Sequence, residues 1–224
     1  MRWLVATVAE TVPETARAVT LRLDVPGWPG HRAGQHVDVR LTAEDGYSTQ
    51  RSYSIASPPG SERLELTVER IDDGEVSPYL TTVADLGDQF ELRGPIGGWF
   101  VWDGTDTAPV LLVGGGSGVV PLRAILRHHA ASGSTAAVHL VYSARTLGDL
   151  ISHRDPEALA APPAGGDPDP HAGVGAGLGR APGPRRCRLA RRGGLAAVGA
   201  AALLRVRAHR VRRTGRRRPG GIGP

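Results

Sequence analysis

One stretch marks the point at which the fold of this chain changes: residues 110–121 read VLLVGGGSGVVP. Its first four residues form an apolar run, which is typical of a strand buried in a parallel sheet. The glycine-rich segment 114–118 ends that strand, and Pro121 suits the first turn of a helix. A second apolar run, Val138–Tyr142, follows the expected helix. This order predicts one β-α-β unit, the beginning of a doubly wound domain.

The residues before this stretch predict a different architecture. Residues 64–69, LELTVE, alternate between apolar and polar side chains, which predicts a strand with one face on a core and the other in water. One helix is expected, capped by Ser77, with Pro78 in its first turn and its end near Ala84. Turn-forming clusters separate six strand-like runs, which predicts a small antiparallel barrel. The expected strands are Trp3–Ala9, Ala18–Val25, His36–Leu41, Gln50–Ala56, Leu64–Arg70 and Gln89–Arg93.

Composition divides the chain again near its last third. Residues 161–224 hold 14 of the 27 basic residues and two of the 22 acidic ones, so the net charge of +5 comes from this segment. All ten aromatic residues lie at or before Tyr142. A segment so poor in large apolar side chains cannot offset the entropy of ordering, which predicts disorder. We therefore expect a barrel domain over 1–103, a truncated doubly wound domain over 108–158 and a disordered basic tail over 159–224.

Several classes of site are excluded or disfavoured. The single Cys187 cannot form a disulfide, a cysteine zinc site or a plant-type iron–sulfur cluster within the chain. No spacing indicates a metal site, and His128 and His129 are expected to be surface and partial core residues of a helix. Residues 1–12 lack the apolar core of a signal peptide, and the longest late apolar run, 195–204, is about half the length of a membrane helix. We expect a cytoplasmic protein with no membrane partner.

Arg51-Ser52-Tyr53-Ser54 lies in the fourth expected strand and has the side chains that a flavin requires. Arg51 and Tyr53 share one face of a strand, and the two serines share the other. An arginine can bind a pyrophosphate through two hydrogen bonds, a tyrosine ring can stack on an isoalloxazine, and a serine can reach its edge. Residues 74–77 precede a helix start, where free backbone N–H groups attract phosphate. The alternative is an ordinary strand without a ligand.

Three ordered motifs support the flavin interpretation. Residues 51–54 (RSYS), 74–80 (GEVSPYL) and 94–97 (GPIG) resemble, in order and spacing, the ferredoxin–NADP reductase superfamily. The resemblance covers residues 2–155 and implies an N-terminal FAD-binding barrel followed by an NAD(P)-binding domain. It implies that Arg51 contacts the flavin phosphates and that Tyr53 and Ser54 lie at the reacting ring. FAD is favoured, and FMN remains open. The other implied flavin contacts are Ser52, Gly74, Val76 and Ser77.

The glycine-rich segment also has two interpretations. Its spacing is not the Rossmann G-x-G-x-x-G fingerprint, and a plain strand-to-helix turn would look similar. In the same superfamily, however, Gly-Gly-Gly-Ser-Gly followed by proline is the nicotinamide dinucleotide loop. Ser143 and Arg145 follow the second strand, where relatives bind the adenosine ribose, and together they favour the 2′-phosphate of NADPH. If Arg145 is only a solvated loop residue, NADH stays equally open. The implied loop contacts are Gly114, Gly115, Gly116, Ser117 and Gly118.

The motifs predict a flavin-dependent oxidoreductase in which NAD(P)H reduces FAD and the electrons pass to an acceptor. That acceptor could be a ferredoxin, an oxygenase component or a small molecule. One alternative is a flavin-binding remnant without NAD(P)H turnover. Another is nucleic-acid binding through the arginine-rich end. This end would bind nucleic acid through charge alone, but it lacks interleaved aromatic residues and a folded reader, so no specific nucleic-acid partner is expected.

The last third departs from the superfamily pattern. Relatives present a Cys-Gly-Pro motif near the nicotinamide, and residues 156–224 contain none. When the last two bases of each codon are read with the first base of the next, residues 205–213 become compatible with Val-Cys-Gly-Pro-Thr-Gly-Phe-Val-Glu. We therefore predict that the tail is translated out of frame, which the nucleotide sequence of the gene would test.

Overall fold

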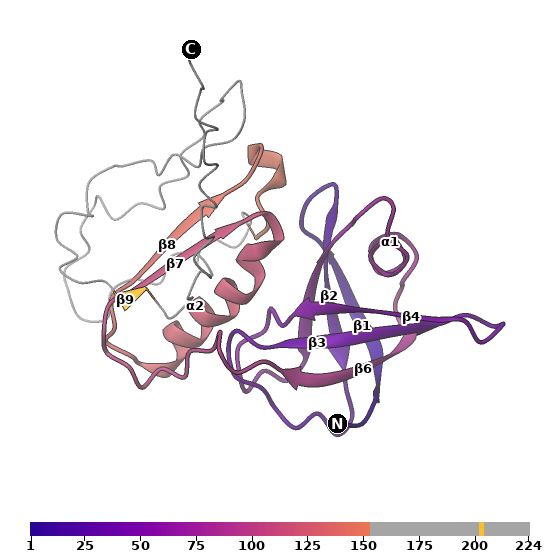
Figure 1. Cartoon of the computed structure of the whole chain (residues 1–224), viewed down its shortest axis with the longest axis horizontal. Helices are drawn as coiled ribbons and strands as arrows, with labels where there is room; N and C mark the ends of the chain where they lie inside the picture. Colours follow the sequence, from indigo (N-terminus) through magenta and orange to yellow (C-terminus); the bar gives the residue numbers. More distant parts are fainter. Residues whose placement is uncertain (153–201, 204–224) are drawn as a thin grey trace, which may run out of the picture.

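The computed structural model describes residues 1–152 and 202–203, which form two units (Figure 1). The first unit is an antiparallel sheet with the strand order β4-β3-β6-β1-β2-β5. A bridge between Ile55 and Leu66 joins its two edges, so the sheet closes into a barrel. The predicted six-stranded antiparallel barrel is confirmed. Its strands are β1 (Leu4–Pro13), β2 (Ala18–Asp24), β3 (His36–Thr42), β4 (Ser48–Ser54), β5 (Leu64–Glu69) and β6 (Gln89–Ile96).

Strand β5 differs from its prediction. Glu65 and Thr67, which the alternating pattern places in water, are only 7% and 4% exposed. Thr67 Oγ1 lies 2.7 Å from Thr20 Oγ1 on β2, and the Glu65 carboxylate accepts a hydrogen bond from Arg127 of the second unit. The one-sided pattern was therefore misleading, because the surface that covers the outer face of β5 comes from a distant part of the chain.

Helix α1 (Val76–Thr82) contributes two side chains, Val76 and Leu80, to the apolar core of the barrel. The prediction that Ser77 caps it was wrong: Glu75 holds the N-cap position and makes no capping hydrogen bond through its side chain. The Ser77 hydroxyl instead accepts a hydrogen bond from the Ile71 N–H at 3.0 Å. A serine hydroxyl can satisfy either a helix amide or a loop amide, and here the loop amide is the one within reach.

The second unit has the predicted β-α-β order. Strands β7 and β8 are parallel, and the two-residue strand β9 pairs with the other edge of β7. Leu122, Ile125 and Leu126 on the helix pack with Val110 and Leu112 of β7. The elements are β7 (Val110–Gly115), the short 3₁₀ helix η1 (Gly116–Val119), α2 (Val120–Ser132), β8 (Val138–Ser143), the 3₁₀ turn η2 (Leu147–Asp149) and β9 (Ala202–Leu203).

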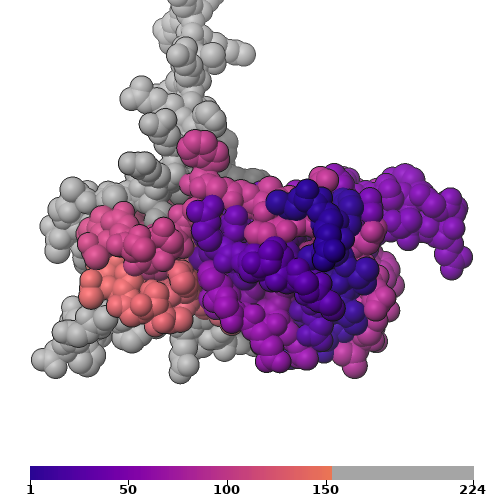
Figure 2. Space-filling view, turned by 90° about the horizontal axis from the view of Figure 1, so that it is seen from below, coloured from indigo at the N-terminus to yellow at the C-terminus, as the bar shows by residue number. Residues whose placement is uncertain are grey.

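The connection between the two units is well packed. Trp102, beside the predicted boundary, is 3% exposed and donates its backbone N–H to the Ala33 carbonyl of the barrel at 3.2 Å. Its ring lies 5.8 Å from the ring of His128 and 5.4 Å from that of His129 on α2. His129 is buried against the Ala136 carbonyl, at 2.8 Å, and is a core residue. The second unit therefore lies directly against the barrel, as the space-filling view in Figure 2 shows.

The expectations of disorder and of out-of-frame translation for residues 159–224 lie outside the described residues, apart from the two residues of β9. Within the described part of the chain, no helix has the length and apolar character needed to cross a membrane.

Candidate functional site

Strand β4 presents its arginine to solvent. Arg51 is exposed, and its Nη1 donates to the Gln50 carbonyl at 2.6 Å and to Thr49 Oγ1 at 3.5 Å. No carboxylate of the described residues pairs with Arg51, whereas the neighbouring Arg40 is held by Glu91. The Arg51 guanidinium therefore keeps donors for an external anion, and a phosphate fits this donor geometry.

Tyr53 follows on the same face of the strand. Its ring is half-buried and packs against the barrel core. Burial raises the pKa of Tyr53 to about 12, against a smaller opposing effect of Arg51. The phenol is thus neutral near physiological pH and offers a flat ring for stacking. Ser54, the last residue of the motif, is half-buried opposite His36 of β3.

Ser52 makes a contact that the motif did not reveal. Its hydroxyl donates to Asp38 Oδ1 on β3 at 2.6 Å, and Arg93 on β6 donates to Asp38 Oδ2 from Nε and Nη2, both at 3.0 Å. The hydrogen bond from Ser52, and then the contact with Arg93, hold the pKa of Asp38 below its usual value. The Ser52 hydroxyl therefore ties β4 to its neighbours, and its proton is already donated within the barrel.

Tyr47, which the sequence analysis did not single out, connects the first two motifs. It lies in the turn before β4, and its hydroxyl is 3.2 Å from both carboxylate oxygens of Glu75, directly before α1. This contact brings residues 74–77 beside β4, the strand that carries Arg51–Ser54. Val76 and Ser77 are buried, so their contacts with a phosphate would come from backbone groups. The Gly74 N–H already donates to the Ile71 carbonyl at 2.9 Å, so Gly74 serves the turn and does not donate to a phosphate.

The glycine loop requires glycine at two positions. A Cβ on Gly114 would lie 2.8 Å from Leu122 Cδ1 and 3.1 Å from the Gly118 carbonyl oxygen, so the close packing of α2 on β7 leaves no room for a side chain. Gly116 has φ +53°, a left-handed conformation that costs other residues about 1–2 kcal/mol. Gly115 lies beside the Ser143 carbonyl, and open space adjoins Gly118. The loop backbone is thus accessible to a ligand.

A carboxylate of the barrel reaches this loop. The Ser117 N–H donates to Glu69 Oε2, at the end of β5, at 3.3 Å. Glu69 was not predicted as a site residue, because nothing in the sequence relates position 69 to position 117. Glu69 therefore accepts the hydrogen bond of a loop amide that could otherwise donate to a phosphate oxygen.

A cavity of about 180 Å³ opens where Glu69 meets the glycine loop. Arg145 is 76% exposed in its side chain, and its Nε lies 3.9 Å from Asp149 Oδ2. The structure thus brings together three predicted residues, Gly116, Ser143 and Arg145, and adds two acids that the prediction missed. The lining residues are Glu69, Gly116, Ser143, Ala144, Arg145 and Asp149.

The cavity and the flavin motif lie along the same closing edge of the barrel. Ile55, directly after Ser54, bridges to Leu66, and Glu69 is three residues further along β5. Three residues of a strand span about 10 Å. An extended ligand on β4 and a second ligand at the glycine loop could therefore meet near this edge.

Comparison with known proteins agrees with this geometry. Residues 5–101 match the family of oxidoreductase FAD-binding domains. The reductase component of propane 2-monooxygenase from Gordonia sp. (strain TY-5) is 34% identical over 147 residues, covering 64% of this chain and 41% of that protein. Ferredoxin–NADP reductase B from Sorangium cellulosum is 40% identical over 129 residues, covering 57% of this chain and 52% of that protein. The chain thus spans about two fifths to one half of the length of these relatives.

A solved structure supports the same assignment. A cytochrome P450 reductase from Amycolatopsis superposes with a TM-score of 0.63 at 29% identity, over 71% of this chain and 49% of that one. The last barrel strand ends at Ile96, so the barrel is less than half of the chain. Because the superposition covers 71% of the chain, it extends beyond the barrel into the second unit. Over the barrel and the start of the second unit, the chain is therefore similar to ferredoxin reductase-like FAD- and NAD(P)-binding oxidoreductases, the superfamily that its three ordered motifs resemble.

Proposed function

We propose that this chain is the flavin- and nicotinamide-binding part of an electron-transfer reductase. In this role it takes hydride from NAD(P)H onto a bound FAD and passes the electrons to a separate acceptor. The observation that carries the proposal is the cavity at Glu69 and Gly116, which adjoins the barrel edge that presents Arg51–Ser54. Bound FAD would supply the exchange between two-electron and one-electron chemistry.

The residues of the barrel bind and orient the flavin. The exposed guanidinium of Arg51 binds the phosphates, while the neutral ring of Tyr53 packs on the isoalloxazine. Ser54 supplies a hydroxyl near the ring edge. The backbone N–H groups of Val76 and Ser77 bind the pyrophosphate, and Gly74, whose own N–H donates to the Ile71 carbonyl, forms the turn before them. Ser52 holds the strand through Asp38.

The second unit binds the dinucleotide. Gly114–Gly118 presents backbone N–H groups before α2, and Ser117 lies next to the barrel edge at which the nicotinamide would meet the flavin. Ser143 and Arg145 stand at the carboxyl end of β8, where open α/β sheets bind the adenosine ribose. Arg145 can donate hydrogen bonds to the 2′-phosphate of NADPH, whereas the carboxylates of Asp149 and Glu69 would repel this phosphate and favour the unphosphorylated ribose of NADH. Both dinucleotides are therefore candidates.

The acceptor is proposed from the relatives. The propane 2-monooxygenase relative is named as a reductase component and the Sorangium relative as a ferredoxin–NADP reductase. An oxygenase component or a ferredoxin is therefore the proposed electron acceptor, and a small molecule is the alternative. No part of this proposal requires nucleic-acid binding.

The domain division is proposed as a barrel over 1–103 and a truncated nucleotide-binding domain over 108–158. The out-of-frame origin of residues 159–224 is a separate proposal that rests on the compatible codons for Val-Cys-Gly-Pro. Sequencing of the gene tests it: a stop codon in the adjacent frame, or the absence of this motif there, would contradict it.

Anaerobic titration tests the function. The purified chain is loaded with FAD, separated from free flavin and mixed with NADH or NADPH. Loss of the yellow absorbance with either dinucleotide supports the reductase. A yellow protein that dithionite bleaches and neither dinucleotide does would be a flavin-binding remnant. Failure to retain any flavin would contradict the proposal as a whole.

A further inference from the structure

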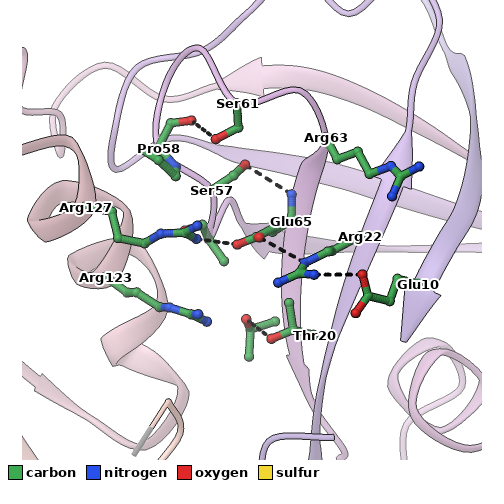
Figure 3. Close-up of polar contacts among 12 residues, drawn as sticks. Glu10, Thr20, Arg22, Ser57, Pro58, Ser61, Arg63, Glu65, Arg123 and Arg127 are labelled. Atoms are coloured by element: carbon green, nitrogen blue, oxygen red, sulfur yellow. Dashed lines mark hydrogen bonds and ion pairs between the residues drawn. The ribbon is translucent and has the colours of Figure 1, made fainter. Parts of the chain in front are cut away.

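We propose that Arg127 and Glu65 are positioning residues that set the distance between the flavin strand (β4, which carries Arg51–Ser54) and the dinucleotide loop (the glycine loop, residues 114–118). This inference rests on the proposed function, because it concerns the approach of the two cofactor sites. Its basis is a polar network that joins the segment after the flavin motif, strand β5 and helix α2 (Figure 3).

Glu65 is the centre of this network. Its Oε2 accepts a hydrogen bond from Arg127 of α2, and its Oε1 accepts one from Arg22 Nε of β2 at 3.3 Å. Arg22 is itself held by Glu10 at 2.7 Å. A carboxylate that is only 7% exposed depends on such charged donors, and loss of one donor leaves an uncompensated charge. The positions of α2 and β5 are therefore strongly coupled.

Arg127 extends this coupling to the flavin strand. Its Nη1 also donates to the Ala56 carbonyl at 3.4 Å, two residues after Ser54. Ala56 donates its N–H to the Glu65 carbonyl at 2.8 Å, and the Glu65 N–H donates to Ser57 Oγ at 3.1 Å. The backbone after the flavin motif and the Arg127 guanidinium are thus bound to the same residue of β5.

A second ion pair fixes the rotation of the helix. Arg123 lies one turn before Arg127 on the same face of α2. Its Nη1 donates to Glu14 Oε1 at 3.2 Å, and both side chains are 9% exposed. Glu14 also accepts hydrogen bonds from Thr20 Oγ1 at 2.6 Å and from the Ser152 N–H at 2.8 Å. Two contacts one turn apart restrain both rotation and sliding, which a single contact cannot do.

Helix α2 continues directly from the glycine loop through η1. A shift of α2 against β5 therefore moves the amides of residues 114–118, while Ala56 moves with β5. Reacting atoms must approach to about 3–3.5 Å, and a displacement of about 1 Å can cost roughly 100-fold in rate. The network is consequently placed to control the rate of flavin reduction more than the affinity for flavin.

The test compares Arg127→Gln with the matched control Arg40→Gln. Arg40 forms two 2.7 Å hydrogen bonds with Glu91 on the neighbouring strand β6, and neither residue is one of the proposed cofactor contacts. Arg127→Gln is expected to lower the limiting rate of anaerobic flavin reduction, at saturating dinucleotide, roughly ten-fold or more. FAD affinity should change by less than about two-fold, and Arg40→Gln should leave rate and affinity unchanged. Arg127→Lys, which keeps the charge, should recover part of the rate.

Hydrogen exchange gives a readout that needs no turnover. In Arg127→Gln the amides of residues 54–57 and 114–119 should exchange faster than in the wild type, and in Arg40→Gln they should not. A wild-type limiting rate together with unchanged exchange at 114–119 would overturn the proposal. If neither dinucleotide bleaches the wild type but exchange rises as expected, the positioning stands and the proposed function fails. If Arg127→Gln does not fold, the limiting rate of flavin reduction and the hydrogen exchange are measured on Glu65→Gln and Arg127→Lys instead.

Discussion

The flavin strand and the dinucleotide loop are held in different ways. Residues Ser48 to Ser54 are paired in register with β3 at every position, and the polar contacts of this strand stay within the barrel. The glycine loop, by contrast, contacts the barrel through Glu69, and its helix is fixed by Glu14 and Glu65. The proposed flavin site is thus built by one unit, whereas the proposed dinucleotide site depends on both. A substitution on the barrel can therefore impair the dinucleotide site and leave the flavin site intact.

The largest expected effect tests the self-contained side of this comparison. Arg51→Gln should weaken FAD binding by about 3 kcal/mol, or roughly 100-fold, because it removes charge-assisted hydrogen bonds to the phosphates. Fluorescence titration of the unloaded protein with FAD measures this loss. Arg63→Gln is the control: Arg63 is another exposed barrel arginine, paired with Asp24 at 2.9 Å. Equal FAD affinity for Arg51→Gln and the wild type would remove Arg51 from the flavin site.

A smaller effect is expected from the packing of the glycine loop. Gly114→Ala would place a Cβ 2.8 Å from Leu122 Cδ1 and should destabilise the protein by about 1–3 kcal/mol through overpacking. Thermal unfolding measures the change. Gly118→Ala faces open space and should leave stability nearly unchanged. Equal losses for both variants would show that the contact between α2 and β7 does not require glycine at position 114.

Glu69 tests the dependence of the dinucleotide site on the barrel. Glu69→Gln should strengthen dinucleotide binding roughly three- to five-fold, corresponding to about 0.5–1 kcal/mol, because it removes a negative charge from the cavity proposed to receive phosphate. The gain should be larger for NADPH and should diminish at high salt. Calorimetric titration with the oxidised dinucleotides measures it, with Glu44→Gln, in the β3–β4 turn, as control. Weaker binding would mean that Glu69 holds a ligand hydroxyl.

The smallest effect concerns acid stability within the barrel. The folded-state pKa of Asp38 is lowered, so its contribution to stability is present above its ordinary pKa of 3.8 and is lost as pH falls through the folded-state value. Asp38→Asn should therefore be less stable than the wild type at pH 7 and lose less stability on acidification below about pH 4. Denaturant unfolding at several pH values measures both. Parallel stability curves for the two proteins would contradict this role.

Periodicity and turn chemistry were sufficient to predict most elements. Short strand-like runs between turn-forming clusters gave the six barrel strands, and the apolar run followed by glycine and proline gave β7 and α2. These predictions succeeded because hydrophobic period and backbone freedom are local properties. The Ser77 cap failed because the competing Ile71 amide is brought close by the fold of the loop. The burial of Glu65 and Thr67 was missed for a similar reason, since their covering groups lie on β2 and α2.

The sequence by itself determined the order of the elements, the three motifs and the resemblance to the superfamily, because each depends on residues close together in the chain. Only the tertiary structure decided that Ser52 serves the barrel through Asp38 and that Glu69 occupies an amide of the glycine loop. It also decided that Arg127 joins the helix to the flavin strand through Glu65, 62 residues away in sequence. Such contacts depend on how the closed barrel meets the second unit. No local pattern encodes that geometry, because the partners come together only when both units are folded.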